Sequence, residues 1–204
     1  MTSSEIIVYT GVMCSGKTKA LLEKAERLKI MDKDYKIFYP IACSNGEKEA
    51  IYSRAGLRES AVSVESIHEI LEHINPSDNN IIIDEIQFFK TISFEKPFSK
   101  SLCLSKLMQF FEKESKNVYI AGLETDFANN PFYLTQTAIT YATKVYKLKA
   151  VCMICKKENA SKNYRERNGK PCLRNEPVLI ERTDKSVEYL PICASCYHDK
   201  YKEG

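Results

Sequence analysis

The chain lacks the features that would assign it to a membrane or to a nucleic acid. No apolar run approaches the ~20 residues that a membrane-spanning helix needs, so no membrane partner is expected. The 30 basic residues nearly balance the 27 acidic ones, and a net charge of +3 gives no global attraction to a polyanion such as nucleic acid. Residues 1–5 contain no basic segment like that of a signal peptide, so we expect a cytoplasmic protein.

Short apolar segments alternate with amphipathic ones through the first three quarters of the chain. Alternation of this kind predicts βαβ units and a mostly parallel sheet flanked by helices, an α/β fold. Residues 41–58 are polar and irregular, and no element is predicted there. Strands are expected at residues 5–10, 35–39, 61–65, 80–84, 117–122 and 143–149, and helices at residues 17–31, 66–74, 101–115 and 131–141.

The character of the sequence changes after residue 149. The remaining stretch is rich in cysteine and turn residues, reads as β-like, and shows no long helix. The chain length suits one medium domain with a small appendage. We therefore predict an α/β domain over residues 1–149 and a small β-rich domain over residues 150–204.

Residues 11–18 read Gly-Val-Met-Cys-Ser-Gly-Lys-Thr and match the phosphate-binding pattern GxxxxGK[ST]. The glycines allow backbone N–H groups to surround phosphate oxygens, Lys17 reaches the β- and γ-phosphates, and the Thr18 hydroxyl ligates Mg²⁺. A predicted strand precedes the motif and a predicted helix follows it, which makes a chance match improbable and indicates a P-loop NTPase-type domain. The residues predicted to bind the phosphates of ATP are Gly11, Met13, Cys14, Ser15, Gly16, Lys17 and Thr18.

An Asp-Glu pair ends the most apolar predicted strand, residues 80–84. A P-loop needs a second acidic ligand for Mg²⁺ at the end of a neighbouring strand, and Asp84 stands there. Glu85 follows, where a carboxylate would accept a proton from an attacking hydroxyl. It would equally activate water in an ATPase, and the plain alternative is two solvated acids at a strand end.

Two cysteine pairs, Cys152/Cys155 and Cys193/Cys196, enclose residues 156–192. Four thiolates at this spacing fit a tetrahedral structural zinc site that closes the base of a β-rich loop. A module this small has little core of its own, so a metal would contribute to its folding. The alternatives are four free thiols, a redox pair, or His198 as a competing ligand.

In this order the motifs resemble those of the type II thymidine kinases, whose small C-terminal domain is a zinc-anchored loop termed the lasso. The resemblance implies ATP as phosphate donor, Mg²⁺ and structural Zn²⁺ as cofactors, the 5′-hydroxyl of thymidine or deoxyuridine as acceptor, and a homotetramer. It covers nearly the whole chain and rests on residues 11–18, Asp84–Phe89, Gly122–Phe127, Lys147–Cys155 and Cys193–Cys196.

The resemblance also implies roles for single residues. Glu85 stands at the position of the general base, Asp84 and Thr18 at magnesium positions, and Lys17 at the phosphate lysine. The residues at the family's nucleoside-binding positions are Met13, Phe88, Leu123, Phe127, Asn163 and Tyr189.

The chain departs from the family where an Asp-x-Arg normally follows the second strand, because Cys43 and Asn45 stand there. Lys48 and Arg54 are candidates to replace the arginine. Further departures are Cys14, Glu124, Asn163 and Glu181.

These departures leave a second hypothesis open, a catalytically weak relative that binds nucleotide or nucleoside as a sensor or assembly subunit. An adenylate-kinase-like enzyme fits less well, because its phosphate loop is richer in glycine and its cysteines lie mid-chain. A DExx translocase would need two motor domains, which a chain of 204 residues does not hold.

Overall fold

The computed structural model describes residues 4–44, 49–90, 98–180, 184 and 186–202. Its centre is a six-stranded, wholly parallel sheet with the strand order β5-β2-β6-β7-β1-β8. The predicted α/β fold is therefore confirmed. The strands are β1 (Ile6–Gly11), β2 (Lys36–Pro40), β5 (Val62–Val64), β6 (Asn80–Ile83), β7 (Asn117–Gly122) and β8 (Lys144–Leu148).

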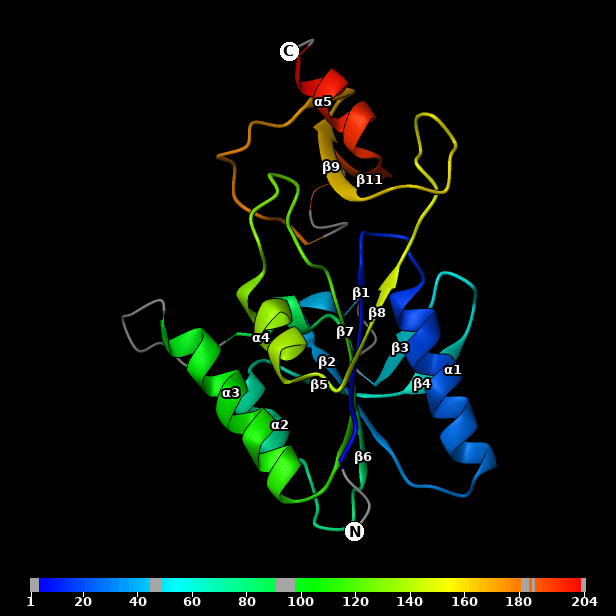
Figure 1. Cartoon of the computed structure of the whole chain (residues 1–204), viewed down its shortest axis with the longest axis vertical. Coiled ribbons are helices and arrows are strands. Elements are labelled where there is room, and N and C mark those ends of the chain that lie inside the picture. The colour runs from blue at the N-terminus through cyan, green and yellow to red at the C-terminus, as the bar shows by residue number, and fades with distance from the viewer. Residues whose placement is uncertain (1–3, 45–48, 91–97, 181–183, 185, 203–204) are drawn as a thin grey trace.

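Helices cover both faces of this sheet, so its central strands are buried on both sides (Figure 1). The side chains of Ile6 and Val8 join a cluster with α2 (Ile67–Glu72), α3 (Phe98–Lys113) and α4 (Tyr133–Tyr141). Ile7, between them, joins a second cluster with Leu21 and Leu28 of α1 (Lys17–Ile30). This division follows from the two-residue side-chain period of a strand.

A hairpin of β3 (Ala50–Tyr52) and β4 (Arg58–Ser60) lies in the stretch predicted to be irregular, so that prediction was wrong. A 3-10 turn, η1 (Ile41–Cys43), precedes it. Each strand has only three residues, too few for a visible alternation. The hairpin is fixed by burial of Ala50 and Ile51, of which Ile51 packs in the cluster beside α1.

The C-terminal part is a small antiparallel sheet, ordered β10-β9-β11, followed by a helix (Figure 1). It comprises β9 (Lys162–Arg167), β10 (Lys170–Pro171), β11 (Val187–Ile192) and α5 (Ala194–Lys202). Its own apolar cluster includes Tyr164 and Tyr197. The Tyr197 hydroxyl donates to the carbonyl of Phe127 at 2.7 Å, which ties this part to the loop after β7.

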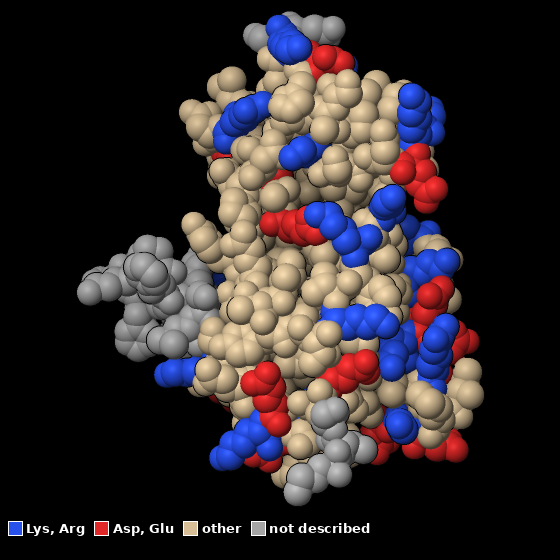
Figure 2. Space-filling model, in the orientation of Figure 1, with Lys and Arg blue, Asp and Glu red and all other residues tan. Residues whose placement is uncertain are grey.

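The helix α5 was not predicted, because the sequence after residue 149 reads as β-like and rich in turn residues, and this helix has only 9 residues. The proposed boundary at residues 149/150 falls directly after β8, which ends at Leu148. Within the described residues no helix is both long and apolar enough to cross a bilayer. On the face shown in Figure 2, basic and acidic side chains are intermixed.

Candidate active site

The phosphate loop joins β1 to α1 and has the backbone conformation that its glycines permit. Gly11 has φ of 143°, and a Cβ there would lie 2.4 Å from the carbonyl oxygen of Leu148 on β8. Gly16 has φ of 85° directly before the first turn of α1. A side chain at Gly11 would clash with β8, and a side chain at Gly16 would strain the backbone. The result is a tight loop against the N-terminus of α1, an arrangement that favours an anion.

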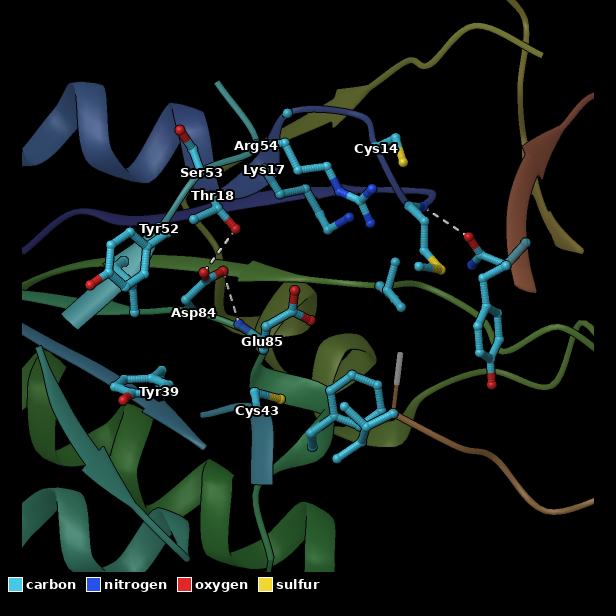
Figure 3. Close-up of a pocket in the computed structure, with 18 of the residues that line it drawn as sticks. Cys14, Lys17, Thr18, Tyr39, Cys43, Tyr52, Ser53, Arg54, Asp84 and Glu85 are labelled. Atoms are coloured by element: carbon cyan, nitrogen blue, oxygen red, sulfur yellow. Dashed lines mark hydrogen bonds between the residues drawn. The ribbon is translucent and has the colours of Figure 1, made fainter. Parts of the chain in front are cut away.

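Lys17 and Thr18 project from the first turn of α1 toward the ends of β1 and β6 (Figure 3). The Lys17 ammonium is buried and donates to the carbonyl of Val12 at 2.8 Å. Burial lowers its pKa, while the nearby carboxylates of Glu85 and Asp84 raise it. The Lys17 side chain thus reaches back across the loop that the sequence predicts to surround phosphate.

Asp84 is buried at the end of β6 and accepts two hydrogen bonds. The Thr18 hydroxyl donates to one carboxylate oxygen at 2.8 Å, and the backbone N–H of Glu85 donates to the other at 3.0 Å. Burial, and next the charge of Glu85, raise the pKa of Asp84 to about 7. A divalent cation would reverse this shift, so Thr18 and Asp84 together offer the oxygen ligands that Mg²⁺ prefers.

Glu85 has φ of 50°, a left-handed conformation at the start of the 3-10 turn η2 (Ile86–Phe88). The side-chain NH₂ of Gln87 donates to the Glu85 carboxylate, and the side-chain oxygen Oε1 of Gln87 accepts from the backbone N–H of Leu123 at 3.0 Å. A Cβ at Gly122 would come within 3.0 Å of that Gln87 oxygen. Gln87 therefore fixes the direction of the Glu85 side chain, and Gly122 makes room for Gln87.

One cavity of about 660 Å³ lies where the carboxyl ends of the parallel strands meet the C-terminal sheet. This is the position at which open α/β sheets bind ligands. On the phosphate side the predicted residues that line it are Met13, Cys14, Gly16, Lys17, Thr18 and Asp84. On the opposite side they are Glu85, Phe88, Leu123, Phe127, Asn163 and Tyr189. Of the predicted site residues outside the cysteine pairs, Gly11 and Ser15 do not line the cavity.

Asn163 is buried on β9 and connects three segments through its side-chain amide. Its oxygen accepts from the backbone N–H of Met13 at 2.8 Å, and its nitrogen donates to the carbonyl of Thr125 at 2.8 Å. Both halves of the amide are therefore engaged with the protein. The predicted role of Asn163 in nucleoside binding stays a prediction, and its hydrogen bonds join the phosphate loop to the lasso.

Arg165 was not singled out in the sequence, although its side chain is fully buried next to the cavity. Its guanidinium lies 3.6 Å from the centroid of the Phe127 ring and donates to the carbonyl of Pro177 at 2.6 Å. It also forms an ion pair with Glu176 at 3.0 Å. Nearby, the Tyr189 hydroxyl donates to the carbonyl of Leu179 at 2.7 Å. These contacts hold residues 176–180 at the wall of the cavity.

Other residues extend the cavity beyond the predicted set. Tyr52, Ser53 and Arg54 of the β3–β4 hairpin line it, as does Cys43. Burial raises the pKa of the Cys43 thiol, and the charges of Glu85 and Asp84 raise it further. Of the departures from the family pattern noted in the sequence, Asn45 and Glu181 lie outside the described residues, as does Lys48.

The two cysteine pairs meet at the base of the lasso. The four sulfur atoms lie within 4.8 Å of one another, a cluster consistent with zinc. Burial raises the pKa of Cys152, but backbone hydrogen bonds from Cys155, Cys193 and Ile154 outweigh it and lower the pKa to about 6. In the same cluster, the hydrogen bond to Cys193, and next burial, raise the pKa of the Cys196 thiol to about 12, so binding of a metal to all four sulfurs would release protons. His198 is not part of the cluster.

Comparison with known proteins agrees with the resemblance seen in the sequence. Residues 4–197 match the family model described as thymidine kinase. Among solved structures, the genome packaging NTPase B204 from Sulfolobus turreted icosahedral virus 2, in complex with ATP-gammaS, aligns with a TM-score of 0.45 and 15% identity. That alignment covers 70% of this chain and 73% of the packaging protein. Because the family model extends over nearly the whole sequence, the chain belongs to the thymidine kinase family.

Proposed function

We propose that the protein transfers the γ-phosphate of MgATP to the 5′-hydroxyl of thymidine or deoxyuridine. The observation that supports this most is the single cavity in which the phosphate loop, the Asp84–Glu85 pair and the lasso all take part. Such a cavity brings a phosphate donor and a flat aromatic acceptor to the same carboxylate. Membership of the thymidine kinase family supports the same reaction.

On the donor side, the backbone N–H groups of residues 13–18 would bind the phosphate oxygens. Lys17 would exchange its hydrogen bond to the Val12 carbonyl for one to a phosphate oxygen. Thr18 and Asp84 would hold Mg²⁺, which neutralises charge on the β- and γ-phosphates. The hydrogen bond between Thr18 and Asp84 already holds the two oxygens 2.8 Å apart, so both could contact one metal ion.

On the acceptor side, Glu85 is the proposed general base. Its carboxylate takes the proton of the 5′-hydroxyl as that oxygen bonds to the γ-phosphorus, and the bond from the γ-phosphorus to the bridging oxygen breaks to release ADP. Gln87 holds the carboxylate in place through its side-chain amide. The role of Gln87 is positional, because it contacts Glu85 and not the reacting atoms.

The nucleoside base would lie between the aromatic residues after β6 and β7 and the wall formed by the lasso. Phe88, Leu123 and Phe127 supply apolar area, and Val178–Ile180 of the lasso also line the cavity. Backbone recognition would read the hydrogen-bonding edge of the base with little dependence on the lasso side chains. The cytoplasmic location and the homotetramer expected from the sequence stand beside this function as proposals.

The experiment that tests the function is a nucleoside phosphorylation assay on the wild type and on Glu85→Gln. We expect wild-type protein with MgATP to form thymidine monophosphate, and the variant to lose at least ~10²-fold in kcat because its amide accepts no proton. Binding of ATP, measured by calorimetry, should change little. A variant with undiminished turnover would remove Glu85 as the base.

A second candidate function is binding without turnover, as a sensor or assembly subunit. The departure after β2 favours it, because Cys43 and Asn45, at the positions of the family's Asp-x-Arg, supply no positive charge for the transferred phosphoryl group. Tight binding of thymidine and ATP by the wild type, with no monophosphate formed, would select this candidate.

A further inference from the structure

The proposed reaction requires positive charge at the transferred phosphoryl group. Charge spreads over its equatorial oxygens in the transition state, and phosphotransfer enzymes often neutralise it with an arginine in addition to the metal and the phosphate-loop lysine. The segment after β2 supplies no arginine, because Cys43 and Asn45 stand at the positions of the family's Asp-x-Arg. A guanidinium from elsewhere in the fold would fill this requirement.

Arg54 projects into the cavity from the turn between β3 and β4. It lines the same cavity as Lys17, Thr18 and Glu85. Figure 3 shows its guanidinium beside the Lys17 ammonium, and the Glu85 carboxylate is drawn below both. Burial is the main cause of the lowered pKa of Lys17, and the charge of Arg54 lowers it further, which agrees with their closeness.

The turn that presents Arg54 is internally hydrogen-bonded. The backbone N–H of Ser53 donates to the carbonyl of Leu57 at 2.9 Å, and that of Gly56 donates to the carbonyl of Ser53 at 3.0 Å. The buried Ser53 hydroxyl accepts from the backbone N–H of Leu57 at 3.1 Å. With Ile51 packed against α1, these bonds place Arg54 in a fixed part of the cavity.

The other cations nearby are placed differently. Lys19 also lines the cavity, but its half-exposed side chain pairs with Glu23 one turn along α1 at 3.6 Å. Arg58, on β4 of the same hairpin, lies over the ring of Tyr52 at 5.4 Å. Arg54 is the only arginine among the described residues that line the cavity.

We propose that Arg54 is a catalytic residue whose guanidinium contacts the γ-phosphoryl oxygens during transfer. The proposal rests on the kinase function proposed above. Arg54 forms and breaks no covalent bond. Two of its N–H groups donate to oxygens whose negative charge grows as the bond to ADP lengthens, and these hydrogen bonds strengthen at that moment. A β-hairpin thereby supplies the positive charge that Asn45, at the arginine position of the family's Asp-x-Arg, does not.

Kinetics of Arg54→Ala test the proposal, with Arg58→Ala as the matched control. Both changes remove one arginine from the exposed part of the same hairpin, so both proteins should melt near the wild type. We expect Arg54→Ala to lower kcat by ~10³-fold or more, with the KM for thymidine changed less than about threefold. Arg54→Lys should recover only part of the rate, because an ammonium lacks the guanidinium fork. Arg58→Ala should keep the wild-type kcat.

A binding assay separates this proposal from the function on which it rests. ADP with aluminium fluoride and magnesium mimics the transferred group, and its affinity needs no turnover. Wild-type protein should bind this complex at least ~10²-fold more tightly than Arg54→Ala does, while ATP binds both proteins equally. If the wild type forms no monophosphate, the kinase function fails, and this binding ratio still decides the role of Arg54. Equal affinity of the two proteins, or an undiminished kcat in Arg54→Ala, would overturn the proposal.

Discussion

Replacing Arg165 with leucine should detach the lasso from the nucleoside side of the cavity while leaving the phosphate side intact. The guanidinium is fully buried and joins four groups from three parts of the chain. It bonds to Glu176 at 3.0 Å and to the Pro177 carbonyl at 2.6 Å, and it lies on the ring of Phe127. It also reaches the Tyr189 hydroxyl at 3.4 Å.

The size of the effect follows from these contacts. A hydrogen bond to a charged group contributes about 1.5–3 kcal/mol, and a desolvated cation–π contact about 2 kcal/mol. The sum overstates the loss of stability. The Glu176 side chain is 23% exposed and can be hydrated once its partner is removed, and leucine fills part of the volume of the arginine. A net cost of about 3–5 kcal/mol, typical of a broken buried ion pair, is the expected range.

The loss should appear as nucleoside affinity, because residues 176–180 would no longer be held at the cavity wall. We expect the KM for thymidine to rise ~10²-fold or more and the KM for ATP to change less than about threefold. Steady-state kinetics with each substrate varied in turn measure both values. Denaturant titration of the same protein measures the stability.

Arg167→Leu is the matched control on the same strand. Its side chain is 43% exposed and pairs with the same Glu176 at 3.4 Å, and with Asp184 at 3.6 Å. Partly exposed pairs of this kind contribute about 0–1 kcal/mol, so this variant should bind thymidine almost normally. Equal effects of the two substitutions, or an equal rise of both KM values in Arg165→Leu, would refute the reasoning.

Two further predictions concern charge and metal. The pKa of Asp84 is raised to about 7 from the ordinary 3.8, so its contribution to folding is present at acid pH and is lost as the pH rises through 7. Without added magnesium, the Tm of Asp84→Asn should therefore rise relative to the wild-type Tm between pH 5 and pH 8. A difference between the two Tm values that does not change with pH would contradict a buried charge at Asp84. Removal of zinc by chelation, or Cys152→Ser, should lower the Tm and abolish thymidine binding before ATP binding, as measured by metal analysis and calorimetry. A folded, metal-free protein that binds thymidine would exclude a structural zinc.

The sequence predicted the sheet and its helices because their cores are built from long, regular patterns. The run Ile81–Ile83 marks a strand buried on both sides, and α1 repeats apolar residues at helical spacing, so each element is visible in a local window. The short strands β3 and β4 are not visible in this way. Their burial depends on Ile51 reaching a cluster built from distant strands.

The candidate site shows the same division between local motifs and distant contacts. The residues of the phosphate loop and of the Asp84–Glu85 pair were predicted as motifs, and all of these predicted residues except Gly11 and Ser15 line one cavity. Gln87 and Arg165 were missed as positioning residues, because their partners lie far away or in an irregular segment. Gln87 bonds to the backbone of Leu123, and Arg165 pairs with Glu176. Polar residues of this kind give no periodic signal.

The amide of Asn163 has a consequence for how the two substrates influence each other. It accepts from Met13 in the loop that would receive phosphate and belongs to the strand that begins the lasso. A displacement of the phosphate loop on nucleotide binding would therefore be transmitted through Asn163 to the lasso, which would enclose the acceptor. Linkage makes the effect mutual, so each substrate should alter the affinity for the other by the same factor. One short side chain would then make the protein a cooperative two-substrate binder within a single subunit.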